Sequence, residues 1–166
     1  MQKAAIRTGT KAGNDDAQTD ASSRDHLNNK LFFRLFQAAN IYETQAVREM
    51  SLSAVMGATL GALSRDVNGM LFSDLYGYLG VSRQNLDAVL KGLEKKGLVE
   101  RIEVENDRRK RIVCLTPAGV EAWKDVRRRS IDFFRRGTKG ISTTEVADCA
   151  ETLSRIGRAL RAMQSG

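Results

Sequence analysis

The chain has 166 residues, enough for one domain with a buried core or one domain with tails. Its 27 Lys and Arg against 20 Asp and Glu give a formal charge of +7, which favours polyanionic partners without requiring one. No apolar stretch approaches the roughly 20 residues of a membrane span, and the N-terminus lacks the apolar core of a secretory signal peptide. We therefore expect a cytoplasmic protein with no membrane partner.

The two cysteines argue against a disulfide framework and against a metal site. Cys114 and Cys149 match no metal-ligand spacing and fit reduced, buried thiols better than a bridge. Cys114 alternates with apolar neighbours, and Cys149 falls among the apolar positions of a predicted helix, so both are more often core residues than redox sensors. We predict no metal and no cofactor.

Residues 1–26 are rich in Ala, Thr, Gly, Asn and Asp, with scarcely an aliphatic side chain among them. Such a segment buries too little apolar area to offset the entropy of ordering, so we predict a flexible tail. The remaining residues, 27–166, carry a single proline and apolar residues at three-and-four spacing, which predicts one mainly helical domain. Its first helix begins near Leu27 and carries large apolar side chains at Leu31, Phe32, Leu35, Phe36, Ala39 and Tyr42.

Three shorter helices follow. Ser53 is a good N-cap for a helix that ends before the turn-like residues 66–69, and a short helix then stops at Gly80, which suits the left-handed conformation of a C-terminal cap. Ser82 is a good N-cap for the next helix, SRQNLDAVLKGLEKK. Helix, tight turn and helix in this order predict a helix-turn-helix.

The apolar pattern changes from helical period to alternation between residues 98 and 115. Two alternating runs, 98–104 and 112–115, flank the polar tip ENDRRKR, which predicts two short strands joined by a basic loop. Thr116 as N-cap and Pro117 at the first helical position then begin another helix, which ends at a pair of glycines.

The last helix begins with a capping box of Ser142 and Glu145. Its apolar residues recur at alternating spacings of three and four, which predicts a narrow contact line for another helix. We call this line the C-terminal seam: Val146, Cys149, Leu153, Ile156, Leu160 and Met163.

The helix after Ser82 has two distinct faces on a wheel of 100° per residue. An arc of about 100° is apolar and should face the core: Leu86, Val89, Leu90 and Leu93. A separate arc of about 140° is polar or small: Arg83, Gln84, Asp87, Ala88, Lys91 and Lys95. Such a face can read base edges, since Arg pairs with guanine, Gln pairs with adenine and Ala contacts the thymine methyl group. For the helix alone, an ordinary solvated face is an equally good interpretation.

The order of the parts decides between these interpretations. A recognition-type helix followed at once by a hairpin with a basic tip is the winged helix-turn-helix order, in which the helix enters the major groove and the wing reaches the minor groove. The stretch GVSRQNLDAVLKGLEKKGLVERIEVENDRRKRIVCLTPAG resembles the core signature of the MarR family of bacterial transcriptional regulators. The resemblance lies in the G-L-V-x-R exit, the D-R-R tip and the L-T-x-x-G junction, and helix order and length are compatible with it from about Leu31 to Met163.

The resemblance implies a mainly α fold with a small β-hairpin wing, and a homodimer. Its dimerisation helices, about 27–50 and 117–164, would interlock, and its winged helix-turn-helix domains, about 53–116, would straddle a pseudo-palindromic DNA duplex. The residues agree, since the Phe-rich first helix and the C-terminal seam carry more apolar surface than one small domain readily covers.

Within the wing, an arginine of Asp107-Arg108-Arg109 would enter the minor groove, oriented by the Asp107 carboxylate. Phosphate contacts are expected from basic wing residues, from Arg101 if its strand places it outward, and from the Ser82 hydroxyl. The predicted DNA contacts are Ser82, Arg83, Gln84, Asn85, Asp87, Ala88, Lys91, Lys95, Arg101, Asp107, Arg108, Arg109, Lys110 and Arg111.

Some members of this family sense oxidants through a cysteine near the start of the first helix, a position where this chain has none. A small-molecule effector is therefore the expected input. In similar proteins, phenolic or aromatic carboxylates bind between the dimer helices and the winged domain, where a cation and aromatic or Met walls are needed. The candidates are Arg34, Tyr42, Arg48, Met56 and Arg65, each of which is alternatively a surface charge or a packing residue.

We predict a dimeric, sequence-specific regulator that binds double-stranded DNA, a repressor by default because steric blocking needs only binding. An architectural or protein-interaction winged helix without an effector is the alternative, and it predicts no duplex binding or binding without sequence preference. The Gln84 and Asn85 pair favours the regulator. An enzyme is not expected, because the chain has one histidine, His26, no G-x-S-x-G and no phosphate-binding glycine loop.

Overall fold

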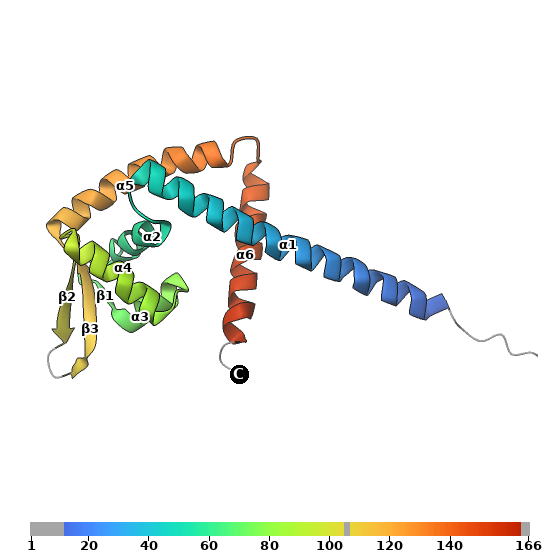
Figure 1. Cartoon of the computed structure of the whole chain (residues 1–166), viewed down its shortest axis with the longest axis horizontal. Helices are drawn as coiled ribbons and strands as arrows, with labels where there is room; N and C mark the ends of the chain where they lie inside the picture. Colours follow the sequence, from blue (N-terminus) through green and yellow to red (C-terminus); the bar gives the residue numbers. More distant parts are fainter. Residues whose placement is uncertain (1–11, 105–106, 164–166) are drawn as a thin grey trace, which may run out of the picture. The chain divides into compact units, whose positions relative to one another are not determined.

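The computed structural model describes residues 12–104 and 107–163, and the side chains of 22–103 and 110–163. The chain divides into two compact units, Met1–Gln45 and Ala46–Gly166. Helices dominate both units, and a small antiparallel sheet belongs to the second (Figure 1). The predicted fold class, mainly α with a small β-hairpin wing, is confirmed.

Helix α1 (Ala12–Met50) supplies all of the described part of the first unit. It begins at Ala12 rather than near Leu27, while the flexibility expected of residues 1–26 stays a prediction. The predicted start near Leu27 rested on where the large apolar side chains begin. A helix that is already nucleated can extend beyond them, because each added residue gains a backbone hydrogen bond. No proline interrupts residues 12–26, so the backbone hydrogen bonds of a helix can continue through them.

In the second unit, α2 (Ala54–Leu63) precedes the helix-turn-helix, which consists of α3 (Phe72–Leu79) and α4 (Arg83–Lys95). The predicted caps are confirmed. The Ser53 hydroxyl accepts from the Met56 N–H at 3.1 Å, and the Ser82 hydroxyl accepts from the Asn85 N–H at 3.1 Å. Gly80 ends α3 with a φ of 69°, a conformation that a side chain would strain.

The core of the second unit forms where these helices meet the sheet. The apolar face predicted for α4 is buried, and it packs with leucines of α2 and α3 and with two valines of the sheet. The largest fully buried apolar side chains are Leu60, Leu63, Leu75, Leu86, Leu90, Leu93 and Val113. Each fully buried leucine contributes roughly 2 kcal/mol of transfer free energy, so this face fixes α4 firmly on the domain.

The sheet has three strands, β1 (Met70–Leu71), β2 (Val99–Val104) and β3 (Asp107–Leu115), in the order β1-β3-β2. All pairs are antiparallel, and Ile102 lies opposite Ile112. Strand β1 was missed, because two residues are too short to show alternation.

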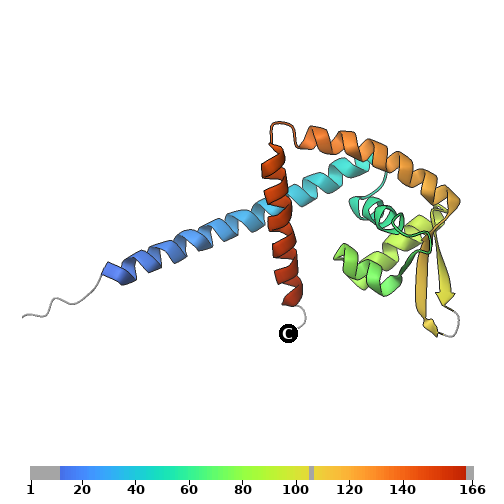
Figure 2. The same cartoon turned by 180° about the vertical axis from the view of Figure 1, so that it is seen from behind.

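The polar tip was also predicted too long. Residues 107–111 continue strand β3, and only Glu105 and Asn106, which lie outside the described residues, separate the two strands. In both views the β2–β3 hairpin extends beyond α3 and α4 (Figures 1 and 2). The outer part of a projecting hairpin has no side that faces the core, so its residues need not alternate between apolar and polar. The sequence therefore lacks the alternation by which this part of the strand could have been predicted.

Thr116 joins the sheet to α5 (Pro117–Gly137). Its hydroxyl accepts from the Gly119 N–H at 3.0 Å, as predicted for an N-cap, and also donates to the Gly97 carbonyl at 2.6 Å. The last helix, α6 (Thr143–Ala162), begins with the predicted capping box of Ser142 and Glu145. Across the described residues, no helix combines the length and apolar character that crossing a membrane requires.

Candidate nucleic-acid interface

Helix α4 presents most of its predicted polar arc to solvent. The exposed residues of the helix and its N-cap are Ser82, Arg83, Gln84, Asn85, Ala88, Lys91 and Lys95. Asp87 is the exception, because it lies toward β2 at the edge of the arc and is half-buried. The surface open to a ligand is therefore narrower than the sequence predicted.

Arg101 of β2 covers this edge of α4. Its side chain is only 13% exposed, and Nη1 donates to Asp87 Oδ1 at 2.6 Å. Nη2 donates to the Asp87 carbonyl at 3.4 Å. Nε lies 2.9 Å from Glu94 Oε1, but its N–H is not aimed at that oxygen, so this contact is an ion pair without a hydrogen bond.

The structure therefore does not meet the condition under which Arg101 was predicted to contact phosphate, namely that its strand places it outward. Side chains alternate along a strand, so Arg101 lies on the same face of β2 as Val99, which is buried in the core. That face is turned toward α4. Arg101 and Asp87 are thus engaged with each other rather than presented to a duplex.

The pKa of Asp87 is lowered to about 2, first by its hydrogen bond with Lys91 and then by that with Arg101. Lys91 Nζ lies 2.9 Å from Asp87 Oδ2 and remains largely exposed. One carboxylate therefore holds a covered arginine on one oxygen and an exposed lysine on the other.

The depressed pKa of Asp87 predicts a pH dependence of stability. The ordinary value is 3.8 and the folded value about 2, so the ionised carboxylate stabilises the fold above about pH 4. This contribution is lost as the pH falls from about 4 to about 2. Urea denaturation of the wild type and Asp87→Asn should therefore give different free energies of unfolding near neutral pH, and the gap should shrink through this window. A gap that does not change with pH would contradict the assignment.

The described basic residues of the wing are exposed. Lys110 and Arg111 lie on β3, and Arg111 is paired in register with Glu103 of β2. The backbone of Asp107, Arg108 and Arg109 belongs to β3, but their side chains lie outside the described residues. Insertion of one of these arginines into a minor groove stays a prediction.

Helix α6 leaves the C-terminal seam uncovered in the single chain. No residue between 143 and 162 is buried, and Leu153 and Leu160 are 41% and 42% exposed. Cys149 is exposed too, so its prediction as a core residue is wrong for the protomer. The first unit likewise exposes large apolar side chains along α1: Leu27, Leu31, Phe32, Phe33, Phe36, Ile41 and Tyr42.

Cys114 is the buried thiol that the sequence predicted. It is 8% exposed, and its Sγ donates to the Asn68 carbonyl at 3.4 Å. Burial raises the pKa of this thiol, with smaller contributions from Glu100 and Asp66. A buried thiol with a raised pKa is poorly reactive, in keeping with a packing role.

The ligand candidates divide between the two units. Arg34 and Tyr42 belong to the first, where Arg34 donates to Gln37 Oε1 at 2.8 Å and burial, followed by Glu43, raises the pKa of Tyr42.

The other three ligand candidates belong to the second unit. Arg48 is exposed and Met56 is half-buried, while Arg65 donates to the Tyr78 hydroxyl at 2.6 Å and lies 5.8 Å from the centre of its ring. Because the candidates divide between two compact units, a shared effector site for all five stays a prediction.

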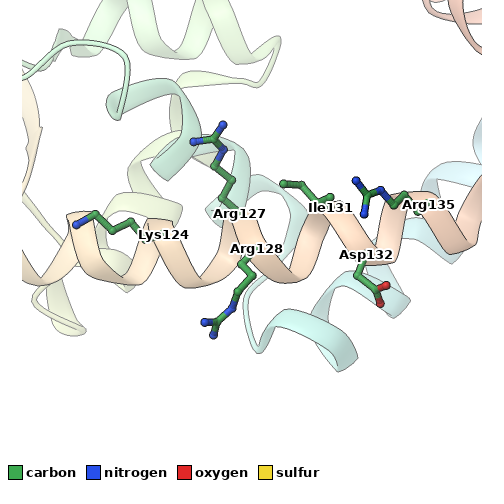
Figure 3. Close-up of a pocket in the computed structure, with 6 residues that line it drawn as sticks. All are labelled: Lys124, Arg127, Arg128, Ile131, Asp132 and Arg135. Carbon is green, nitrogen blue, oxygen red and sulfur yellow. The ribbon is translucent and has the colours of Figure 1, made fainter.

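A shallow depression of about 420 Å³ lies elsewhere, along one face of α5. Figure 3 shows its walls, which are mostly cationic and all come from this helix: Lys124, Arg127, Arg128, Ile131, Asp132 and Arg135. None of the five ligand candidates lines it.

Sequence reasoning missed two residues of this region, Glu94 and Phe72. Glu94 follows Asp87 by seven positions and so lies on the same side of α4, a spacing that could have identified it as a second partner for Arg101. The Phe72 ring lies 5.9 Å from the guanidinium carbons of both Arg83 and Arg101. No sequence signal points to this stacking, because Phe72 is remote from both arginines along the chain.

Comparison with known proteins agrees with this geometry. Residues 57–110 match the model of the MarR family. The transcriptional activatory protein BadR of Rhodopseudomonas palustris is 43% identical over 109 residues, which cover 63% of this chain and 62% of BadR. The match therefore spans less than two thirds of the length of this relative.

Two solved structures show the same fold. CouR of Rhodococcus jostii bound to p-coumaroyl-CoA superposes with a TM-score of 0.67 at 22% identity, over 79% of this chain and 94% of CouR. MosR of M. tuberculosis in complex with DNA gives a TM-score of 0.67 at 21% identity, over 81% of this chain and 96% of MosR. The helix-turn-helix, the wing and the family match all agree, and residues 57–110 match the MarR family.

Proposed function

We propose that the chain is a transcriptional regulator that binds double-stranded DNA with sequence preference. The observation that carries this proposal is the exposed polar face of α4, followed directly by a projecting hairpin that presents Lys110 and Arg111. Side chains of this kind suit base edges and phosphates, respectively. The fold shared with MosR, solved in complex with DNA, and the name of BadR support it.

The proposed active form is a homodimer on a pseudo-palindromic site. The uncovered C-terminal seam supports this, because exposed leucines at heptad-like spacing on a helix that buries nothing favour a second helix as partner. A twofold dimer also presents two α4 helices, which matches the symmetry of a palindrome.

The proposed input is a small aromatic anion. CouR was solved with p-coumaroyl-CoA, a thioester of a phenolic acid, which supports both free phenolic acids and their thioesters as candidates here. Arg34, Tyr42, Arg48, Met56 and Arg65 are the residues proposed to line its site.

The direction of regulation has two candidates. Repression follows from steric blocking, whereas the name of BadR describes an activatory protein. The position of the bound site decides between them: a footprint that overlaps the promoter predicts repression, and one upstream of it predicts activation.

Substitutions on α4 and on the wing should have different effects. Arg83→Ala and Gln84→Ala should relax base preference, each removing about 1–3 kcal/mol of discrimination at the bases read. Arg111→Ala should weaken binding to all duplexes alike. Selection of bound duplexes from a random pool measures both effects, and unchanged base preferences for the two α4 variants would count against α4 as the reading helix.

The same selection tests the function as a whole when it is repeated with a panel of phenolic acids and their thioesters. A regulator should enrich a palindromic sequence and respond to at least one compound. An architectural or protein-interaction module should show no enrichment and no response. Enrichment without any response would leave the DNA-binding proposal intact and remove the effector.

A further inference from the structure

Arg101 lies at the centre of a set of side chains that joins three elements. We call this set the Arg101 cluster: Phe72, Asp87, Glu94 and Arg101. Asp87 and Glu94 come from α4, Arg101 from β2 and Phe72 from the start of α3. Arg101 is only 13% exposed, whereas the two acids are 36% and 32% exposed.

The contacts fix the Arg101 guanidinium in several directions. Nη1 and Nη2 both donate to Asp87, one to the carboxylate and the other to the main-chain carbonyl, while Nε lies beside Glu94. The two acids lie about two helical turns apart, so Arg101 spans this stretch of α4. A planar guanidinium held in this way resists rotation of α4 against β2, which a single point contact would not.

Phe72 extends the cluster to the residue that begins α4. Its ring lies 5.9 Å from the guanidinium carbon of Arg101 and equally far from that of Arg83. It also packs edge-on against Tyr76, with ring centres 5.8 Å apart. The ring therefore places the base-reading candidate Arg83 next to the arginine that binds α4 to the wing.

We propose that Asp87, Glu94 and Phe72 hold Arg101 as a positioning residue that fixes the angle between α4 and the β2–β3 wing, so that Asp87 and Arg101 govern DNA recognition without contacting DNA. This proposal rests on the proposed function as a DNA-binding regulator. With α4 seated in the major groove, the angle decides where the hairpin tip meets the flanking sequence.

Because Asp87 is negatively charged, positioning and simple electrostatics predict opposite changes in DNA affinity when its charge is removed. Removing an acid next to a polyanion should by itself strengthen binding. If Asp87 positions Arg101, Asp87→Asn should instead weaken binding, because the wing loses its fixed direction. Lys91 differs from Arg101, because its ammonium group is exposed and can turn from Asp87 to a DNA phosphate.

Salt dependence separates positioning from phosphate contact. Arg101→Lys keeps the charge but loses the planar fork, so a phosphate contact would survive this substitution and a positioning role would not. We expect Arg101→Lys and Asp87→Asn each to weaken binding to a selected duplex about tenfold, with an unchanged slope of log K against log salt. The control Arg111→Ala should make that negative slope less steep by about 0.9, because one phosphate contact is lost. Wild-type affinity for Arg101→Lys, or tighter binding for Asp87→Asn, would overturn the proposal.

A second measurement needs no DNA. Spin labels at Gln84→Cys on α4 and Glu103→Cys on β2, in a Cys149→Ser background diluted with unlabelled protein, report the α4-to-wing distance within one chain. The wild-type cluster should give a narrow distance distribution, and Asp87→Asn or Arg101→Lys a broad one.

The second measurement also separates this proposal from the proposed function. Equally narrow distributions in all proteins would refute positioning even if every variant folds and binds. The distance distribution could instead be narrow in the wild type and broad in the variants while the wild type binds no duplex selectively. This result would support the positioning role of the Arg101 cluster and refute the proposed function as a DNA-binding regulator. Thermal unfolding of each variant shows whether it remains folded at the temperature of measurement.

Discussion

Gly119→Ala is expected to destabilise the fold by about 3 kcal/mol or more. A β-carbon at this position would lie 1.9 Å from the Leu98 carbonyl oxygen and 2.9 Å from its carbonyl carbon. Both are main-chain atoms, so no side chain can rotate away, and either α5 or the segment that leads into β2 must shift. The glycine of the L-T-x-x-G junction is therefore required because Leu98 approaches it so closely.

Urea denaturation of Gly119→Ala beside Gly77→Ala checks this expectation. Gly77 is also helical, but an added β-carbon there meets nothing within 4 Å. Gly77→Ala should therefore stabilise the protein by about 0.5–1 kcal/mol through helix propensity. Similar changes for the two variants would contradict the steric explanation, because both substitutions add one methyl group to a helix.

Leu153→Lys combined with Ile156→Lys is expected to convert the proposed dimer into monomers. Both residues belong to the C-terminal seam, and two ammonium groups facing two more across a twofold axis would be buried without partners. Operator affinity should fall at least a hundredfold, because one α4 helix then reads only half of the site. Light scattering gives the mass, and titration of a palindromic duplex gives the affinity.

A matched control lies on the same helix. Ala147 is exposed on the side of α6 away from the seam, so Ala147→Lys adds a charge without touching the proposed contact. It should remain dimeric and bind as the wild type does. A dimeric double variant would refute the seam as the interface, while a monomer that keeps full affinity would refute dimeric DNA binding.

Local signals in the sequence were sufficient for most of the helical frame. Ser53, Ser82, Thr116 and Ser142 cap helices as predicted, because capping depends on residues within three positions of each other. The apolar face of α4 was predictable for the same reason, since its apolar residues recur in the sequence with the helical period of 3.6 residues.

Interactions between distant segments were not predictable in this way. Arg101 was expected to face phosphate on condition that its strand placed it outward, but its direction depends on Val99 anchoring β2 in the core. The partners of Arg101 lie on α4 and α3, and Phe72 precedes it by many residues. Strand β1 was missed because its pairing with β3 is set by tertiary contacts rather than by its own two residues.

The Arg101 cluster also has a consequence for changing the DNA preference of this protein. Grafting only α4 from another regulator would leave Arg101 beside whatever residues then occupy positions 87 and 94. A buried arginine that has lost its acidic partners would lower the free energy of unfolding by about 3 kcal/mol or more. The wing would also lose its fixed direction. The transplantable module is therefore the segment from Phe72 through Arg111, moved as one piece. Redesign within the native module is best confined to the exposed edge at Gln84 and Ala88.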